Sequence, residues 1–142
     1  MGWIGCENRT GRFLAKLFGF EWSPDLGAST EVETPAGNAV VDFHCAFARG
    51  QAGGARLEVV RRVPGILWGP TPGSGIHHLG YWSDDVAADT AELERHGYVT
   101  EAVRRGRDGR PFFVFLRSEG GTGFRIELVD RAAKPSLESS WA

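Results

Sequence analysis

Two short segments of this 142-residue chain carry the same pattern of residue types. The segment GARLEVV covers residues 54–60, and GFRIELV covers residues 123–129. In both, an arginine, an aliphatic residue and a glutamate precede two more aliphatic residues, so Glu58 and Glu127 hold matching positions 69 residues apart (127 minus 58). Such an internal repeat favours a fold built from two similar halves.

Four stretches alternate apolar residues with other residues at a period of two, which is typical of half-buried β-strands. They are AVVDFHCAFA (39–48), ARLEVVRRV (55–63), RPFFVFLRS (110–118) and FRIELVD (124–130). Turn-forming segments rich in glycine lie between them. In the second and fourth stretches a glutamate interrupts an otherwise apolar face. We therefore expect those two carboxylates to have partners inside the protein.

Two other stretches have helical spacing. In DDVAADTAELERHGY (84–98), acidic residues lead the first turn and Gly97 closes the helix. In RTGRFLAKLFGF (9–20), Thr10 is a possible cap and Gly19 a stop signal. The second stretch also predicts one apolar stripe, formed by Phe13, Leu14, Leu17 and Phe18.

Each half therefore reads as a short strand, a helix, two strands and a final Arg-x-Glu strand. This order predicts a single α+β domain in which two βαβββ modules form a curved mixed sheet around a cleft. The modules would be residues 1–66 and 76–131, with a proline- and glycine-rich linker at 64–75 and a tail at 132–142. Packing about a pseudo-twofold axis would bring the two glutamates to one cleft. We expect Trp68 and Trp141 to pin the linker and the tail to the body.

Charge and composition exclude several classes of partner. The net charge of −2 and the pI near 6.1 provide no basic surface for nucleic acid or an anionic membrane. No apolar run approaches the roughly 20 residues of a membrane span, and the first residues lack a signal-peptide pattern. Cys6 and Cys45 are too few for a disulfide scaffold. We expect a cytoplasmic protein with reduced thiols and a small-molecule ligand.

The segment GIHHLGYWSDD (75–85) places His77 and His78 next to each other on a strand. Neighbouring strand residues point to opposite faces, so only one of them should share the cleft with the glutamates. Imidazole and carboxylate groups are ligands that borderline divalent metals accept. Such a metal could polarise a carbonyl while a carboxylate or a bound water moves the adjacent proton.

Over nearly its whole length, the chain resembles the vicinal oxygen chelate superfamily, which includes glyoxalase I, methylmalonyl-CoA epimerase, extradiol dioxygenases and the bleomycin- and fosfomycin-resistance proteins. Its paired βαβββ modules match the repeat, and HHLGYW with RIELVD is similar to the second-module signature of glyoxalase-like members. The resemblance implies that Glu58, His78 and Glu127 hold a divalent ion (Ni, Co, Mn, Zn or Fe). His78 is chosen because it precedes the step Leu79-Gly80-Tyr81.

The sequence departs from the family at the first-module ligand, since no histidine precedes His44. His78 lies 19 residues before Gly97 (97 minus 78), and the same spacing from Gly19 falls just before Met1. On this count Gly2-Trp3 would mirror Gly80-Tyr81. An upstream start codon is one explanation. Otherwise three ligands remain, or the site holds no metal.

Plainer interpretations stay open for the same residues. His78 could be satisfied by a backbone carbonyl or water, and Glu58 and Glu127 could pair on a solvated face with Arg56, Arg117 or Arg125. His77 is expected to be structural and to face the helix. The residues expected to line a pocket are Trp3, His44, Tyr81, Phe113 and Phe115, with His44 either a cavity wall or a surface residue.

Two functions follow from the resemblance. The first is a metal-dependent isomerase, epimerase or lyase that acts next to a carbonyl, with Glu58 or Glu127 as the catalytic base. The alternative is a metal-free protein that sequesters a small molecule or antibiotic, like the bleomycin-binding relatives. We expect a homodimer, in which the modules close within one chain or swap between two.

Overall fold

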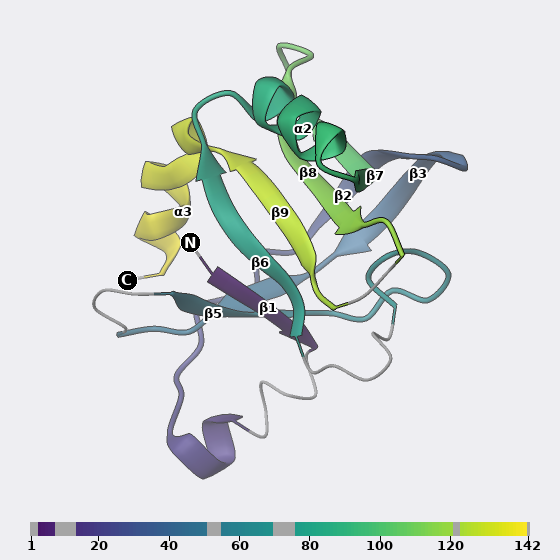
Figure 1. The fold of residues 1–142 in the computed structure, drawn as a ribbon. Coiled ribbons are helices and arrows are strands. Elements are labelled where there is room, and N and C mark those ends of the chain that lie inside the picture. Colours follow the sequence, from purple (N-terminus) through teal and green to yellow (C-terminus); the bar gives the residue numbers. More distant parts are fainter. Residues whose placement is uncertain (1–2, 8–13, 51–54, 70–75, 121–122, 142) are drawn as a thin grey trace.

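The described residues of the computed structural model form one curved, mixed sheet of nine strands, and a helix covers part of one face (Figure 1). The description covers residues 3–7, 14–50, 55–69, 76–120 and 123–141. The strand order is β3-β2-β7-β8-β9-β6-β1-β5-β4. The strands are β1 (Trp3–Glu7), β2 (Ala28–Thr34), β3 (Gly37–Phe43), β4 (Cys45–Phe47), β5 (Arg56–Val60), β6 (Ile76–Ser83), β7 (Tyr98–Arg105), β8 (Pro111–Ser118) and β9 (Arg125–Asp130). The predicted α+β fold with a large mixed sheet is confirmed.

The second half of the chain follows the predicted order of one strand, one helix and three strands. Strand β6 leads into α2 (Val86–Arg95), and β7, β8 and β9 follow. The Asp85 side chain caps α2 by accepting a hydrogen bond from the Ala88 amide, and Gly97 leaves the helix with a φ of 86°. A left-handed φ of this kind favours glycine. Strand β9 then runs parallel to β6 and antiparallel to β8.

The first half repeats part of this pairing. Strand β5 runs parallel to β1 and antiparallel to β4, as β9 does with β6 and β8. The strand predicted at 39–48 is broken at His44 into β3 and β4. Strand β2 forms a hairpin with β3 and reaches β7 through the pair Glu33 and Val103. Strands β3 and β4, which form the two edges of the sheet, are therefore consecutive in the chain and separated only by His44.

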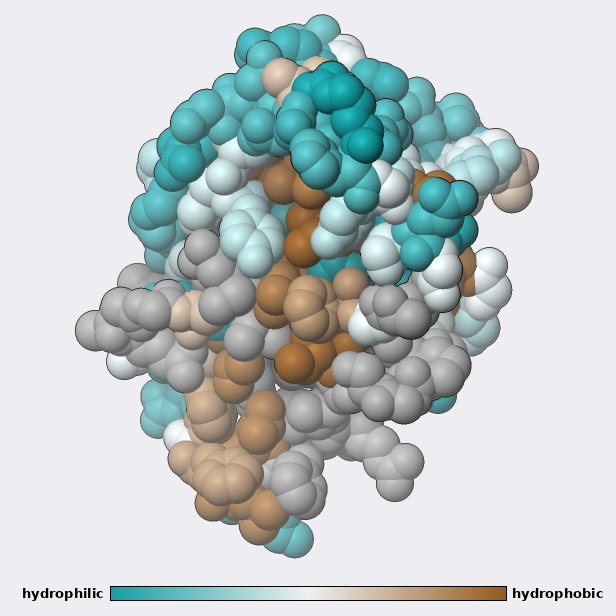
Figure 2. Space-filling view, viewed as in Figure 1, coloured by the Kyte–Doolittle hydropathy of each residue, from teal (hydrophilic) through white to brown (hydrophobic). Residues whose placement is uncertain are grey.

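The first predicted helix is present but does not cover the sheet. Residues 14–18 are helical, and Gly19 ends the helix with a φ of 71°, whereas Thr10 and Phe13 lie outside the described residues. Leu17 and Phe18 are 56% and 68% exposed, so the expected packing of this stripe is wrong for them. The segment projects below the sheet (Figure 1) and adds a hydrophobic patch to the surface, in contrast to the hydrophilic side chains over α2 (Figure 2).

The sheet separates two apolar layers, as the alternation of its strands predicts. The outer layer lies under α2 and contains Val86, Val114, Leu116 and Leu128. The inner layer includes Val41, Cys45, Phe47, Phe113 and Phe115, together with Trp68 and Trp141.

The two tryptophans anchor the linker and the tail, as predicted. The Trp68 ring lies 5.3 Å from that of Phe115, and the Trp141 ring lies 4.8 Å from that of Phe47. Trp141 follows the short helices η1 (Arg131–Ala133) and α3 (Lys134–Ser140). In the described part of the chain, no helix is long and apolar enough to cross a membrane.

Candidate metal centre

Three acidic and imidazole side chains converge on the inner face of the sheet. Glu58 comes from β5, His78 from β6 and Glu127 from β9. One ligand atom from each lies within 4.8 Å of the others. The Nε2 atom of His78 is 2.8 Å from Oε2 of Glu58 and 3.2 Å from Oε2 of Glu127. All three residues are buried, with 4%, 1% and 6% of their surfaces exposed, respectively.

The sheet register explains why the glutamates meet here. Glu127 lies opposite Gly80 in the parallel pair of β6 and β9, and Glu58 lies opposite Gly5 in the parallel pair of β1 and β5. Paired residues project on the same face of a sheet, and a glycine has no side chain. Each carboxylate therefore has space beside it over a central strand, next to His78.

The His78 ring carries a positive charge that offsets one of the two carboxylate charges in this cluster. Burial disfavours its cationic form, but the attraction of the nearby Glu127 and Glu58 carboxylates outweighs burial and raises the pKa of His78 to about 9. The Oε2 atom of Glu58 makes its short contact without the alignment of a hydrogen bond, and has no hydrogen-bond partner among the described residues. A buried carboxylate oxygen in this condition is costly unless a cation satisfies it.

The donor set fits a divalent metal ion. Two carboxylates and one imidazole nitrogen are accepted by zinc and by the neighbouring first-row metals. Three protein ligands also match the number found in catalytic zinc sites, where a further position stays open for water or substrate. Glu58, His78 and Glu127 could thus hold an ion, as the resemblance implied.

His77 does not face the helix, so that expectation is wrong. Its Nδ1 atom lies 2.9 Å from Nδ1 of His78, and its Nε2 atom lies 2.7 Å from the carbonyl oxygen of Leu67. Its ring is also 6.1 Å from that of Phe115, in the inner layer. Burial and the neighbouring charge of His78 lower the pKa of His77 to about 3, which keeps its ring neutral.

The residues expected to line the pocket, Trp3 apart, separate into three groups. Phe113 and Phe115 lie on the inner face, and the Phe115 ring is 5.1 Å from that of His78. Tyr81 packs in the outer layer instead, because it lies an odd number of positions from His78 on β6. His44 lines a separate surface pocket of about 310 Å³ with Asp25 and Arg61. The side chain of Trp3 lies outside the described residues.

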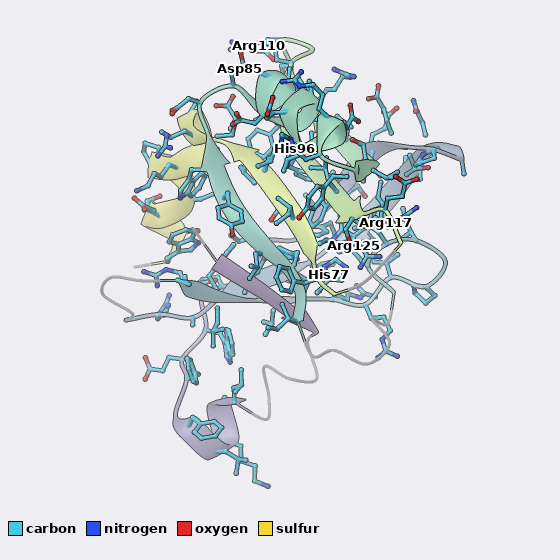
Figure 3. All side chains as sticks on the ribbon, viewed as in Figure 1. His77, Asp85, His96, Arg110, Arg117 and Arg125 are labelled. Atoms are coloured by element: carbon cyan, nitrogen blue, oxygen red, sulfur yellow. The ribbon has the colours of Figure 1, made fainter. Side chains whose placement is uncertain are left out.

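The arginines considered as partners of the glutamates have other contacts. Arg125 and Arg117 lie near each other (Figure 3), and both form ion pairs with Glu101 on β7, Arg117 at 3.2 Å. Arg56 donates to the carbonyl oxygen of Ala48 and lies over the Trp141 ring. Because Glu58 and Glu127 are buried, the solvated-face interpretation is wrong. The sequence did not predict the ion pairs of Glu101 or the hydrogen bond that the Leu67 carbonyl accepts from His77, because both depend on contacts between distant segments.

The register also corrects the assignment of the missing ligand. Across the antiparallel pair of β1 and β6, Trp3 lies opposite Gly80 and Gly5 lies opposite His78. Gly5 is thus the counterpart of Gly80, and Trp3 is the counterpart of His78. The predicted match of Gly2-Trp3 with Gly80-Tyr81 is wrong, because it assumed equal spacing from strand to helix in both halves.

A family model describes this chain. The model of the Glyoxalase/Bleomycin resistance protein/Dioxygenase superfamily matches residues 7–115, more than half of the sequence. The chain belongs to this superfamily. The match includes Glu58 and His78 and ends before Glu127. A search of curated proteins gave no match.

Several solved structures are similar to the chain at low sequence identity. A putative dioxygenase from Bacillus subtilis is 17% identical with a TM-score of 0.47; the similarity covers 89% of this chain and 38% of that one. The trypanothione-dependent glyoxalase I of Leishmania major is 13% identical with a TM-score of 0.36, covering 96% and 88%. A glyoxalase family protein from Enterococcus faecalis is 19% identical with a TM-score of 0.32, covering 89% and 90%. This chain thus spans well under half of the dioxygenase.

Proposed function

We propose that the protein is a divalent-metal-dependent enzyme that moves a proton next to a carbonyl group of a small molecule, as an isomerase, epimerase or lyase. The observation that carries this proposal is the convergence of Glu58, His78 and Glu127 on one buried point. Membership of the superfamily supports it. The substrate is a small molecule.

Each residue has a defined part in this chemistry. Glu58, His78 and Glu127 would hold the ion, which when bound polarises a carbonyl oxygen and acidifies the neighbouring C–H. One of the two glutamates takes that proton as general base and returns it to the same atom in an epimerase or to a neighbouring atom in an isomerase. In a lyase the bond to a group on the neighbouring carbon breaks, and the proton goes to that departing group. Phe115 lies beside His78 and helps to exclude water from the reacting groups.

A second function is favoured by one specific observation. His78 pairs with both Glu58 and Glu127 at short distance, so its cationic ring offsets one of the two carboxylate charges without a metal. With Trp68, Phe113 and Phe115 on the same face, the site could bind a small aromatic molecule and perform no chemistry. In this second proposal the protein sequesters a small molecule without a metal.

Thermal unfolding with single metal ions separates the two proposals. Protein freed of metal by a chelator is melted with Zn²⁺, Co²⁺, Ni²⁺ or Mn²⁺. A ligand that binds only the folded state adds about 2.7 kcal/mol at a hundredfold excess over its dissociation constant, so the melting temperature rises. Glu127→Gln and His78→Ala should remove most of that rise. Glu31→Gln, on the exposed hairpin where Glu31 contacts Asn38, should keep it.

The activity itself is tested by proton exchange. A panel of carbonyl compounds with a neighbouring C–H is incubated in D₂O with the metal-loaded protein and followed by NMR. We expect metal-dependent deuterium incorporation that Glu58→Gln or Glu127→Gln abolishes. If no ion raises the melting temperature while an aromatic ligand does, the sequestering function is correct.

A further inference from the structure

The pairing of β6 with β1 is irregular at His77. Gly5 lies opposite His78, but the next residue of β1, Cys6, lies opposite Ile76. His77 is therefore an extra residue with no partner on β1, which is the arrangement of a β-bulge. A bulge interrupts the alternation of side chains, so consecutive residues can lie on one face. This is why both imidazoles contact Phe115 of the inner layer. Figure 3 shows His77 near the start of β6.

The contacts of His77 fix where its hydrogen lies. Its Nε2 atom is 2.7 Å from the Leu67 carbonyl oxygen, which can only accept, so Nε2 carries a hydrogen. A second hydrogen on Nδ1 would make His77 a buried cation without a carboxylate partner among the described residues. The Nδ1 atom of His77 is therefore a lone-pair acceptor.

One hydrogen lies between the two Nδ1 atoms at their separation of 2.9 Å, and it belongs to His78. We propose that His77 is a positioning residue for the candidate metal centre: it accepts this hydrogen bond and thereby keeps Nε2 of His78 directed at Glu58 and Glu127. A histidine that binds metal through one nitrogen needs such a partner on the other, which fixes its tautomer and ring orientation. Here that partner is a second, neutral histidine.

The hydrogen-bond chain continues into the linker. Leu67 holds His77, and the next residue, Trp68, packs edge-on against Phe115 at 5.3 Å. Phe115 in turn contacts His78 at 5.1 Å. The linker thus supports the His78 ring from two sides, through one hydrogen bond and one aromatic contact. The part of this proposal that concerns metal affinity rests on the proposed function, whereas the direction of the hydrogen bond does not.

The hydrogen bond is tested first on metal-free, ¹⁵N-labelled protein. Its two Nδ1 atoms should show a through-hydrogen-bond ¹⁵N–¹⁵N coupling in NMR spectra, with the shared proton bonded to His78. A proton bonded to His77, or the absence of coupling, would overturn the proposal. This measurement needs no metal, so it is independent of the proposed function.

Zn²⁺ and Co²⁺ titrations then test the effect on the site. His77→Leu removes the acceptor, and His77→Asn retains one, because the amide oxygen of asparagine occupies a place like that of Nδ1. We expect affinity to fall about 10- to 100-fold in His77→Leu and to recover largely in His77→Asn. Equal affinity of His77→Leu and the parent protein would contradict the positioning role, as would equally weak binding by both variants. If the parent protein binds neither ion, the proposed function fails while the hydrogen-bond result stands.

Discussion

Trp3 and Gly80 are direct partners in the antiparallel pair of strands β1 and β6, just as Gly5 and His78 are. The twofold relation that exchanges Gly5 with Gly80 therefore exchanges Trp3 with His78. Replacing Trp3 with histidine should therefore add the missing fourth ligand. We expect the affinity for Zn²⁺ or Co²⁺ to rise on the order of tenfold, about 1.4 kcal/mol, because tetrahedral sites use four ligands. Isothermal titration calorimetry on the two proteins measures the difference.

Ile4→His is the matched control for this variant. Ile4 is next to Trp3 and pairs with Leu79, so its position belongs to the opposite face of β1. The Ile4→His variant should bind Zn²⁺ or Co²⁺ with the same affinity as the parent protein. A gain in Ile4→His with none in Trp3→His would show that the register assignment is off by one residue.

Without metal, His78 should be essential for stability. His78→Ala leaves Glu58 and Glu127 facing each other, buried and without the cation between them. Breaking a buried ion pair by removing one partner costs about 3–5 kcal/mol. We expect a loss of that order in the free energy of unfolding, measured by urea denaturation in the presence of a chelator. His96→Ala, at the exposed end of α2, should have a small effect; a loss as large as in His78→Ala would point to a nonspecific cause.

The C-terminal tail should contribute strongly to folding through one side chain. Trp141 packs on Phe47 and Trp82 and lies under the Arg56 guanidinium. Trp141→Ala should lower the free energy of unfolding by about 3–5 kcal/mol, the usual cost of removing a buried aromatic ring. Trp141→Phe should cost clearly less. Urea unfolding of the three proteins checks this order, and an unchanged midpoint in Trp141→Ala would show that the tail does not pack in solution.

The His44 ring should titrate at a higher pH than an ordinary histidine. A hydrogen bond to Asp25, at 2.6 Å, raises the pKa of His44 above its ordinary value of 6.5, and Asp42, at 3.0 Å, adds to the effect. NMR titration of the ring should give a midpoint above 6.5, and Asp25→Asn should lower it more than Asp42→Asn does. Because the folded pKa is raised, this contact stabilises fully below pH 6.5 and less as pH rises through the folded pKa. A His44 midpoint at or below 6.5 would contradict the paired geometry.

Much of the inner face was predictable because the period of a strand is strict. The alternation in FRIELVD placed Glu127 opposite to Leu128, and the repeat indicated that Glu58 would behave in the same way. Both glutamates do reach His78. Local pattern was sufficient here, since each strand runs unbroken through its site residue.

Prediction failed where a single residue interrupts a strand. The bulge at His77 depends on the register of β6 against β1. The break at His44 coincides with contacts of its ring with Asp25 and Asp42, which are set by tertiary structure. Neither leaves a signal in the period of the sequence. The apolar stripe that includes Leu17 and Phe18 was predicted to pack, but spacing alone does not say whether another element reaches it.

The depth of the three candidate ligands separates how tightly an ion binds from how long it stays. Glu58, His78 and Glu127 are almost fully shielded from solvent, so an ion can enter or leave only when the segments around them move apart. Loss of the ion to a chelator would then proceed at the rate of local opening. Once the chelator captures the ion at every opening, adding more chelator would not make the loss faster. A site with modest equilibrium affinity can in this way retain its ion longer than an open site of the same affinity would. The residence time of the ion would therefore measure how often strands β5, β6 and β9 open locally.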